Sequence, residues 1–250
     1  MKIVKEQIES SKGKLAATVQ YPDVETEKLA ILCPGFLDSK DYAGLTELAN
    51  RLAENGYTAV RFDPTGVWES DGNIEDYTVT QYLEDIKNVL EHMLAKNDFT
   101  HVLLVGHSRG GTAALLYAAR DLQVSAVLGI MSPYKLASWE KWNEDGLRFS
   151  SRDMPGSDEK VEFTIPVSYL EDLEKYDVLE EVKKLKVPVM LLAGEMDKGV
   201  LPGDVKKIYD NVNEPKHFEV IPSVGHDYRV HESQVKLVNE CVMRGLEKMT

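Results

Sequence analysis

The chain has 250 residues, of which 43% are hydrophobic, enough to bury the core of one large domain. Asp and Glu number 42 against 29 Lys and Arg, and the resulting net charge of −13 argues against binding to nucleic acid, anionic membrane surfaces and polyanionic substrates. No apolar leader follows Met1, no run approaches the roughly 18 apolar residues of a transmembrane helix, and Cys33 and Cys241 fit buried thiols, so we expect a cytoplasmic protein.

Apolar, β-branched runs alternate with periodic helical segments along nearly the whole chain. This alternation predicts the α/β fold class, with a mostly parallel eight-stranded sheet that carries helices on both faces. In chain order, the expected strands are Ile3–Glu9, Leu15–Gln20, Leu29–Cys33, Thr58–Phe62, His101–Gly106, Ala126–Met131, Val187–Ala193 and His217–Ile221. The expected helices are Tyr42–Asn55, Thr80–Lys96, Gly111–Arg120, Leu173–Lys184, Gly203–Asp210 and Glu232–Lys248. No helix separates the first two strands, which predicts an antiparallel hairpin near Gly13 at the edge of the sheet.

One segment, residues 132–169, interrupts this alternation within the single domain that we expect to span residues 1–250. It holds six aromatic residues in 38 positions, about twice the density of the whole chain: Tyr134, Trp139, Trp142, Phe149, Phe163 and Tyr169. A long aromatic insertion in a compact domain is typical of a small lid, and the alternative is a surface excursion that packs against the sheet. We expect Trp139, Trp142 and Phe149 to line a substrate pocket.

Residues 106–110 read Gly-His-Ser-Arg-Gly and fit the pattern G-x-S-x-G. They stand between the apolar strand His101–Gly106 and the helical segment that begins at Gly111. A serine on a sharp strand-to-helix turn points its hydroxyl out of the backbone, beside the unpaired amides of a helix N-terminus. Ser108 is therefore the candidate nucleophile, and the alternative is a serine that only caps the helix.

A serine hydroxyl is a weak nucleophile until a base takes its proton, and that base needs an acid to orient it. The base candidate is His226, which follows Gly225 just after the last expected strand. The acid candidate is Asp197, at the end of a G-x-x-D segment after the strand Val187–Ala193, and Glu195 is its rival. We expect activity to rise with pH as His226 loses its proton.

The chain resembles the α/β-hydrolase family over nearly its whole length. The resemblance lies in the order of a strand, the sharp turn at residues 106–110 (the nucleophile elbow), a helix, an acid after a later strand and a histidine after the last strand. This resemblance implies the α/β-hydrolase fold and an oxyanion hole made by the backbone N–H groups of Phe36 and Arg109. Pro34 stands where family members often carry histidine, and Cys33, a rival nucleophile, has no base partner in the family order. Trp68 replaces the second glycine of a segment similar to the family's D-x-x-G-x-G-x-S, so we expect it to line the pocket or to pack beside it.

Serine at the elbow, rather than aspartate or cysteine, favours acyl transfer to water through an acyl-enzyme. The size, the short lid and the elbow resemble small carboxylesterases of the feruloyl and cinnamoyl type, which implies a small hydrophobic or aryl ester as substrate. A thioesterase, an amidase or peptidase, and a non-catalytic binding protein of the same fold remain alternatives.

Arg109 either binds a substrate carboxylate or pairs with a neighbouring acid. We expect no cofactor and no metal, because H-E-x-x-H and C-x-x-C are absent from the sequence. The expected partner is a small-molecule ester, bound by a monomer or homodimer without nucleic acid or membrane.

Overall fold

An eight-stranded sheet forms the centre of the computed structural model, which describes residues 1–135 and 141–249. The strand order is β1-β2-β4-β3-β5-β6-β9-β10. The strands are β1 Lys2–Ser10, β2 Gly13–Tyr21, β3 Lys28–Cys33, β4 Thr58–Phe62, β5 His101–His107, β6 Ala126–Ile130, β9 Val189–Gly194 and β10 Lys216–Ile221. β1 and β2 form the expected antiparallel hairpin, and all pairs from β4 to β10 are parallel. The predicted fold class is confirmed.

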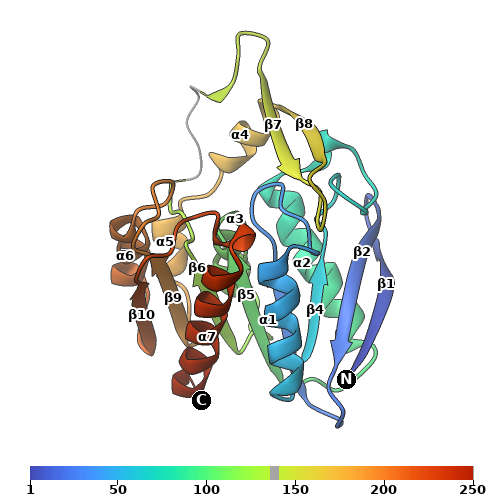
Figure 1. Cartoon of the computed structure of the whole chain (residues 1–250), viewed down its shortest axis with the longest axis vertical. Coiled ribbons are helices and arrows are strands. Elements are labelled where there is room, and N and C mark those ends of the chain that lie inside the picture. Colours follow the sequence, from blue (N-terminus) through green and yellow to red (C-terminus); the bar gives the residue numbers. More distant parts are fainter. Residues whose placement is uncertain (136–140, 250) are drawn as a thin grey trace.

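Helices cover both faces of the sheet (Figure 1). α1 Ala43–Glu54 and α7 Glu232–Met249 lie together on one face. The other face carries α2 Val79–Leu94, α3 Arg109–Ala118, α5 Val178–Val182 and α6 Pro202–Asn211. Because successive strand residues point to opposite faces, Leu29 and Ile31 of β3 belong to the second layer, whereas Ala30 and Leu32 belong to the core beneath α1 and α7. None of the described helices is long and apolar enough to cross a membrane.

The expected helix Leu173–Lys184 is wrong, because two short helices occupy this region. α4 spans Ser168–Leu173, and α5 begins only after Asp177. The Asp177 carboxylate accepts hydrogen bonds from the N–H groups of Leu179 and Glu180, so it caps a new helix instead of continuing the old one. Single 3₁₀ turns are also present at Ile74–Asp76 and Tyr228–Val230.

The insertion 132–169 contains an antiparallel hairpin that the sequence patterns did not predict. Its strands are β7 Leu147–Asp153 and β8 Lys160–Pro166, and Gly156, with φ of 75°, lies in the connecting turn. Figure 1 shows the hairpin standing at one end of the sheet, beyond the carboxyl ends of the parallel strands. The loops that follow β3, β5, β9 and β10 meet at this same end, where open α/β sheets place their ligands.

Candidate active site

Ser108 lies on a strained turn between β5 and α3. Its φ is 51° and its ψ is −119°, in the left-handed half of conformational space that side chains disfavour. The Ser108 N–H donates to the carbonyl of Ile130 at 2.8 Å, which ties the turn to β6. A Cβ atom on Gly106 would lie 2.3 Å from the carbonyl carbon of Gly110, and one on Gly110 would lie 2.1 Å from the Cys33 oxygen. Both glycines are therefore required by close backbone approach.

A continuous hydrogen-bonded chain joins the three residues that the sequence analysis selected. Ser108 Oγ lies 2.9 Å from Nε2 of His226, and Nδ1 of His226 lies 2.6 Å from Oδ2 of Asp197. The other Asp197 oxygen accepts from the N–H groups of Gly199 and Val200 at 2.8 and 2.7 Å. With Nδ1–H donating to the fully buried Asp197 carboxylate, Nε2 of His226 is left to accept the serine proton.

Glu195, the rival acid, has a different role. One of its carboxylate oxygens accepts a hydrogen bond from the N–H of Ser223 at 3.0 Å, which holds the loop after β10. Cys33 is fully buried at the end of β3, and burial raises the pKa of its thiol well above the usual range. A protonated thiol is a poor nucleophile, so Ser108 is the better placed of the two.

The loop after β3 is held from three sides. Tyr82 donates from its hydroxyl to the carbonyl of Pro34 at 2.8 Å, and Trp68 donates from Nε1 to the carbonyl of Leu37 at 3.0 Å. The Leu37 N–H donates to the hydroxyl of Tyr77 at 2.8 Å. Replacing the family histidine by Pro34 therefore leaves a loop whose backbone is fixed by neighbouring side chains.

Phe36 of this loop is also fixed by the hairpin. Arg152 of β7 donates from Nε and Nη2 to the Phe36 carbonyl at 3.2 and 2.8 Å. The Phe36 N–H, in contrast, has no acceptor within the residues that the structure describes. A fixed amide with no internal acceptor is the feature that an oxyanion-hole donor requires.

A buried group of charges lies behind His226, and the sequence analysis missed it. Asp38 lies 3.5 Å from Nδ1 of His107, 3.4 Å from Arg152 and 3.3 Å from Arg229. The ring of His107, the residue before the candidate nucleophile, packs 5.0 Å from the ring of His226. A lone aspartate in the apolar loop Gly-Phe-Leu-Asp was the available signal for this cluster.

Burial has opposite consequences for the two central members of that cluster. Burial alone would raise the pKa of Asp38. The hydrogen bond with His107 and the charges of Arg229 and Arg152 outweigh this effect and hold the pKa of Asp38 below its usual range. Burial lowers the pKa of His107, and the nearby His226 and Arg229 lower it further against the effect of Asp38. The pair therefore consists of a carboxylate and a neutral imidazole at neutral pH.

The four expected pocket residues have different positions. Trp142 stacks on Tyr169, with ring centroids 6.4 Å apart. Trp68 lies behind the loop after β3 and borders a separate cavity of about 660 Å³ under the hairpin turn, so it supports the site instead of lining it. Phe149 is 67% exposed on the outer face of the hairpin, contrary to expectation, because its strand neighbours Arg148 and Ser150 take the inner face. Trp139 lies outside the described residues.

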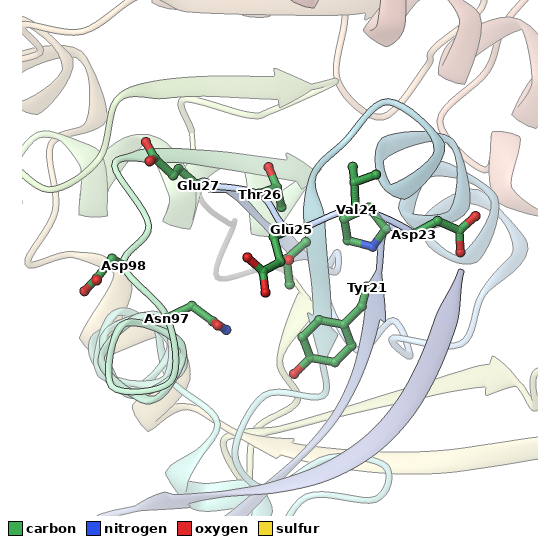
Figure 2. A pocket seen from close by; sticks show the side chains of 10 residues that line it. Tyr21, Asp23, Val24, Glu25, Thr26, Glu27, Asn97 and Asp98 are labelled. Carbon is green, nitrogen blue, oxygen red and sulfur yellow. The ribbon is translucent and has the colours of Figure 1, made fainter.

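A second cavity, of about 560 Å³, lies at the amino ends of β3, β4 and β5, opposite to the end that carries Ser108. The loop between β2 and β3 and the residues before β5 form it, and four acidic residues are among those that line it, namely Asp23, Glu25, Glu27 and Asp98 (Figure 2). Within residues 1–135 and 141–249, no group of three or more His, Cys, Asp or Glu side chains is arranged to hold a metal ion. The hydrogen-bonded chain at Ser108 is the better candidate site.

Comparison with known proteins agrees with this architecture. Palmitoyl-protein thioesterase ABHD10 of Mus musculus, a mitochondrial protein, is 25% identical over 210 residues, which cover 81% of this chain and 69% of the relative. The polyketide transferase grgF of a Penicillium species is 24% identical over 246 residues, covering 82% and 83%. The structure of Est1E from Butyrivibrio proteoclasticus with bound ferulic acid superimposes with a TM-score of 0.79, at 24% identity and 98% coverage of both chains.

A family model described as the alpha/beta hydrolase fold matches residues 29–158, more than half of the chain. That range contains the elbow and the loop after β3. The chain therefore belongs to the alpha/beta hydrolase fold family and is a hydrolase.

Proposed function

We propose that this hydrolase cleaves carboxylic esters through a covalent acyl-serine intermediate. The observation that carries the proposal is the chain of hydrogen bonds from Ser108 through His226 to Asp197, at 2.9 and 2.6 Å. Nucleophile, base and orienting acid are the three parts that acyl transfer by serine requires, and each is held in this structure by its own loop.

In the first half-reaction, Ser108 Oγ bonds to the ester carbonyl carbon while its proton passes to Nε2 of His226. The carbonyl electron pair moves to oxygen, and the N–H groups of Phe36 and Arg109 stabilise the resulting oxyanion. Collapse breaks the bond to the leaving oxygen, which takes the proton from His226 and departs as an alcohol. Water, giving its proton to His226, then releases the acid, and Ser108 recovers its proton.

The aromatic stack beside the loop supports an ester with a flat, apolar acyl group. Tyr77 and Tyr169 are parallel, with centroids 5.7 Å apart, and Phe36 lies 5.1 Å from Tyr169. Tyr77 and Tyr169 are buried, so the partly exposed Phe36 is the ring of this group that offers an apolar surface to an aryl or unsaturated chain. Thioester cleavage is the second candidate, favoured by the similarity to a palmitoyl-protein thioesterase.

The test is a set of three substrates that share one aryl acyl group: an oxygen ester, a thioester and an anilide. We expect the wild type to cleave the oxygen ester fastest and the anilide slowest. Ser108→Ala should reduce turnover of all three by on the order of 10³-fold or more. The control is Ser11→Ala, which alters an exposed serine in the β1–β2 turn and should change nothing. Full activity in Ser108→Ala would disprove the proposed nucleophile, and a dominant thioester activity would replace the ester assignment.

A further inference from the structure

Positively charged side chains and other hydrogen-bond donors lie close together beside the loop after β3, the loop that contains Phe36. The chain as a whole, in contrast, carries a net charge of −13. The guanidinium carbon of Arg148, on the inner face of β7, lies 4.6 Å from the Phe36 ring centroid and 5.4 Å from that of Trp142. The guanidinium of Arg109, the residue after the nucleophile, lies 5.9 Å from the Tyr169 ring. Lys141 adjoins Trp142 in the chain. We call Arg148, Lys141, Trp142 and Tyr169 the donor cluster.

The donor cluster lacks a negative partner in the described part of the chain. Neither Arg148 nor Lys141 forms an ion pair there, whereas Arg152, four residues further along β7 and on the same face, pairs with Asp38. Burial and the charges of Arg152 and Arg109 lower the pKa of Arg148, and burial and the charges of Arg148 and Arg109 lower that of Lys141. Positive charge is therefore concentrated here without compensation from residues 1–135 and 141–249.

Two buried polar atoms of the cluster can donate to a ligand. The Nε1 atom of Trp142 has no hydrogen-bond partner among the described residues. The hydroxyl of Tyr169, which is only 2% exposed, interacts with the guanidinium of Arg109 and keeps its own proton to donate. A buried donor without an acceptor costs roughly 1–3 kcal/mol, so such groups are normally paired, with protein or with something that binds. Each of the four side chains in this cluster can donate a hydrogen bond, and those of Arg148, Lys141 and Trp142 cannot accept one. A ligand that supplies acceptor oxygens therefore fits the cluster.

We propose that the donor cluster binds a carboxylate carried by the substrate, so that the preferred esters are monoanions. The inference rests on the proposed function in one respect, namely that the bound molecule is an ester positioned at Ser108. A guanidinium recognises a planar carboxylate through two parallel hydrogen bonds, and the partly exposed rings of Phe36 and Trp142 leave the rest of the molecule an apolar surface. The overall negative charge of the protein disfavours polyanions but opposes a single carboxylate only weakly.

The test compares two nitrophenyl esters that differ at one group. The acyl chain of the first ends in a free carboxylate, and that of the second ends in a primary carboxamide of the same shape. We expect the wild type to favour the carboxylate by about ten- to a hundredfold in kcat/KM, the range of a charge-assisted hydrogen bond. Arg148→Gln should bring this ratio close to one, and Arg148→Lys, which keeps the charge without the fork, should give an intermediate ratio.

The matched control is Arg51→Gln. Arg51 lies in the last turn of α1, at the other end of the sheet, and pairs with Glu47 at 2.7 Å. Its loss changes the net charge by the same amount and should leave the ratio unaltered. A second pair of substrates carries the carboxylate or carboxamide on the leaving alcohol. A preference in that pair alone supports the cluster and assigns the anion to the alcohol side, whereas a ratio near one in both pairs overturns the proposal.

A binding measurement separates this inference from the proposed function. Calorimetry with Ser108→Ala records binding of the uncleaved carboxylate ester, with and without Arg148→Gln. Binding that weakens about tenfold or more with Arg148→Gln supports the cluster even if the wild type proves inactive on esters. Ester hydrolysis with binding indifferent to Arg148→Gln and Arg148→Lys rejects the cluster and leaves the proposed function intact.

Discussion

Ser108 keeps a backbone conformation that costs on the order of 1–3 kcal/mol for a residue with a side chain. The surroundings hold it there, through the hydrogen bond to Ile130 and the two glycines that allow backbones to touch. In return, the hydroxyl projects from the turn at the distance from His226 that proton transfer needs. The strain is thus confined to the residue on which the proposed chemistry depends.

The pH dependence of activity should reflect one proton. His107 lies against His226, but burial and neighbouring positive charge lower the pKa of His107, so we expect no second proton from His107 in the profile near neutral pH. We expect log kcat/KM to rise with a limiting slope of one as the pH increases from about 5 towards 8. Steady-state rates at closely spaced pH values measure this slope. A slope of two would show that His107 titrates with His226, and a flat profile would contradict the role of His226 as base.

The elements of the sheet were largely predictable, because parallel strands buried on both faces appear as continuous apolar runs such as Leu29–Cys33. The β7–β8 hairpin was not predictable in this way, because its strands contain few buried apolar residues. The inward-facing side chains of β7 are polar or charged and gain their contacts only in the folded domain. Arg148 and Arg152 illustrate this, since their inward direction follows from pairing with β8 and from contacts to Phe36. Local sequence carries no signal for contacts with a loop more than 100 residues away.

The packing of α3 against the loop after β3 gives a prediction about glycine. Gly110→Ala would place a Cβ atom 2.1 Å from the Cys33 oxygen and 2.3 Å from the Pro34 oxygen, both backbone atoms that cannot move cheaply. We expect a loss of about 2–4 kcal/mol in the free energy of unfolding, with reduced esterase activity. Gly203→Ala, in the first turn of α6, meets no atom within 4 Å and should be neutral or stabilising by up to about 1 kcal/mol.

Urea unfolding of both glycine variants measures these differences. Equal stability of the two would mean that α3 can move away from the loop, which would contradict the tight elbow. A large loss of unfolding free energy in Gly203→Ala would show instead that replacing any helical glycine by alanine destabilises this protein, whether or not the added Cβ atom meets a neighbour.

The free energy of unfolding of the whole molecule should depend on pH partly through one buried carboxyl group, that of Asp85. Asp85 of α2 is 1% exposed and accepts hydrogen bonds from the N–H and hydroxyl of Thr65, at 2.8 and 2.7 Å. Burial raises its pKa from 3.8 to about 6, against the effect of those hydrogen bonds. Between these values the unfolded chain loses a proton that the folded chain keeps, so the contribution of Asp85 to stability falls as the pH rises.

The measurement is urea unfolding of the wild type and Asp85→Asn between pH 4 and 7.5. Relative to the variant, the wild type should lose about 3 kcal/mol over this range, with most of the change between pH 4 and 6. The comparison is made as a difference because the other carboxylates titrate in both proteins. Parallel curves would show that Asp85 is ionised in the folded state at all these pH values.

Over the whole chain, the sequence predicted which residues supply the nucleophile, acid and base candidates. It did not predict which side chains pack around them. Ser108, Asp197 and His226 each follow a recognisable strand, and in a parallel sheet the carboxyl ends of strands converge. Asp38 and His107 gain their importance only from burial beside His226, which no spacing rule encodes. The same reason explains why Phe149 was expected in a pocket but is exposed, and why the sequence left open whether Trp68 lines the pocket or packs beside it.

The most direct test of the central claim is covalent labelling with a fluorophosphonate, which reacts with an activated serine. The proposed hydrogen-bonded chain predicts one label per protein molecule, located on Ser108 by peptide mass spectrometry, and its loss in both Ser108→Ala and His226→Gln. The control Ser11→Ala should label like the wild type. Absence of labelling in the wild type, or a label that persists in Ser108→Ala, would contradict the proposal that Ser108 is an activated nucleophile.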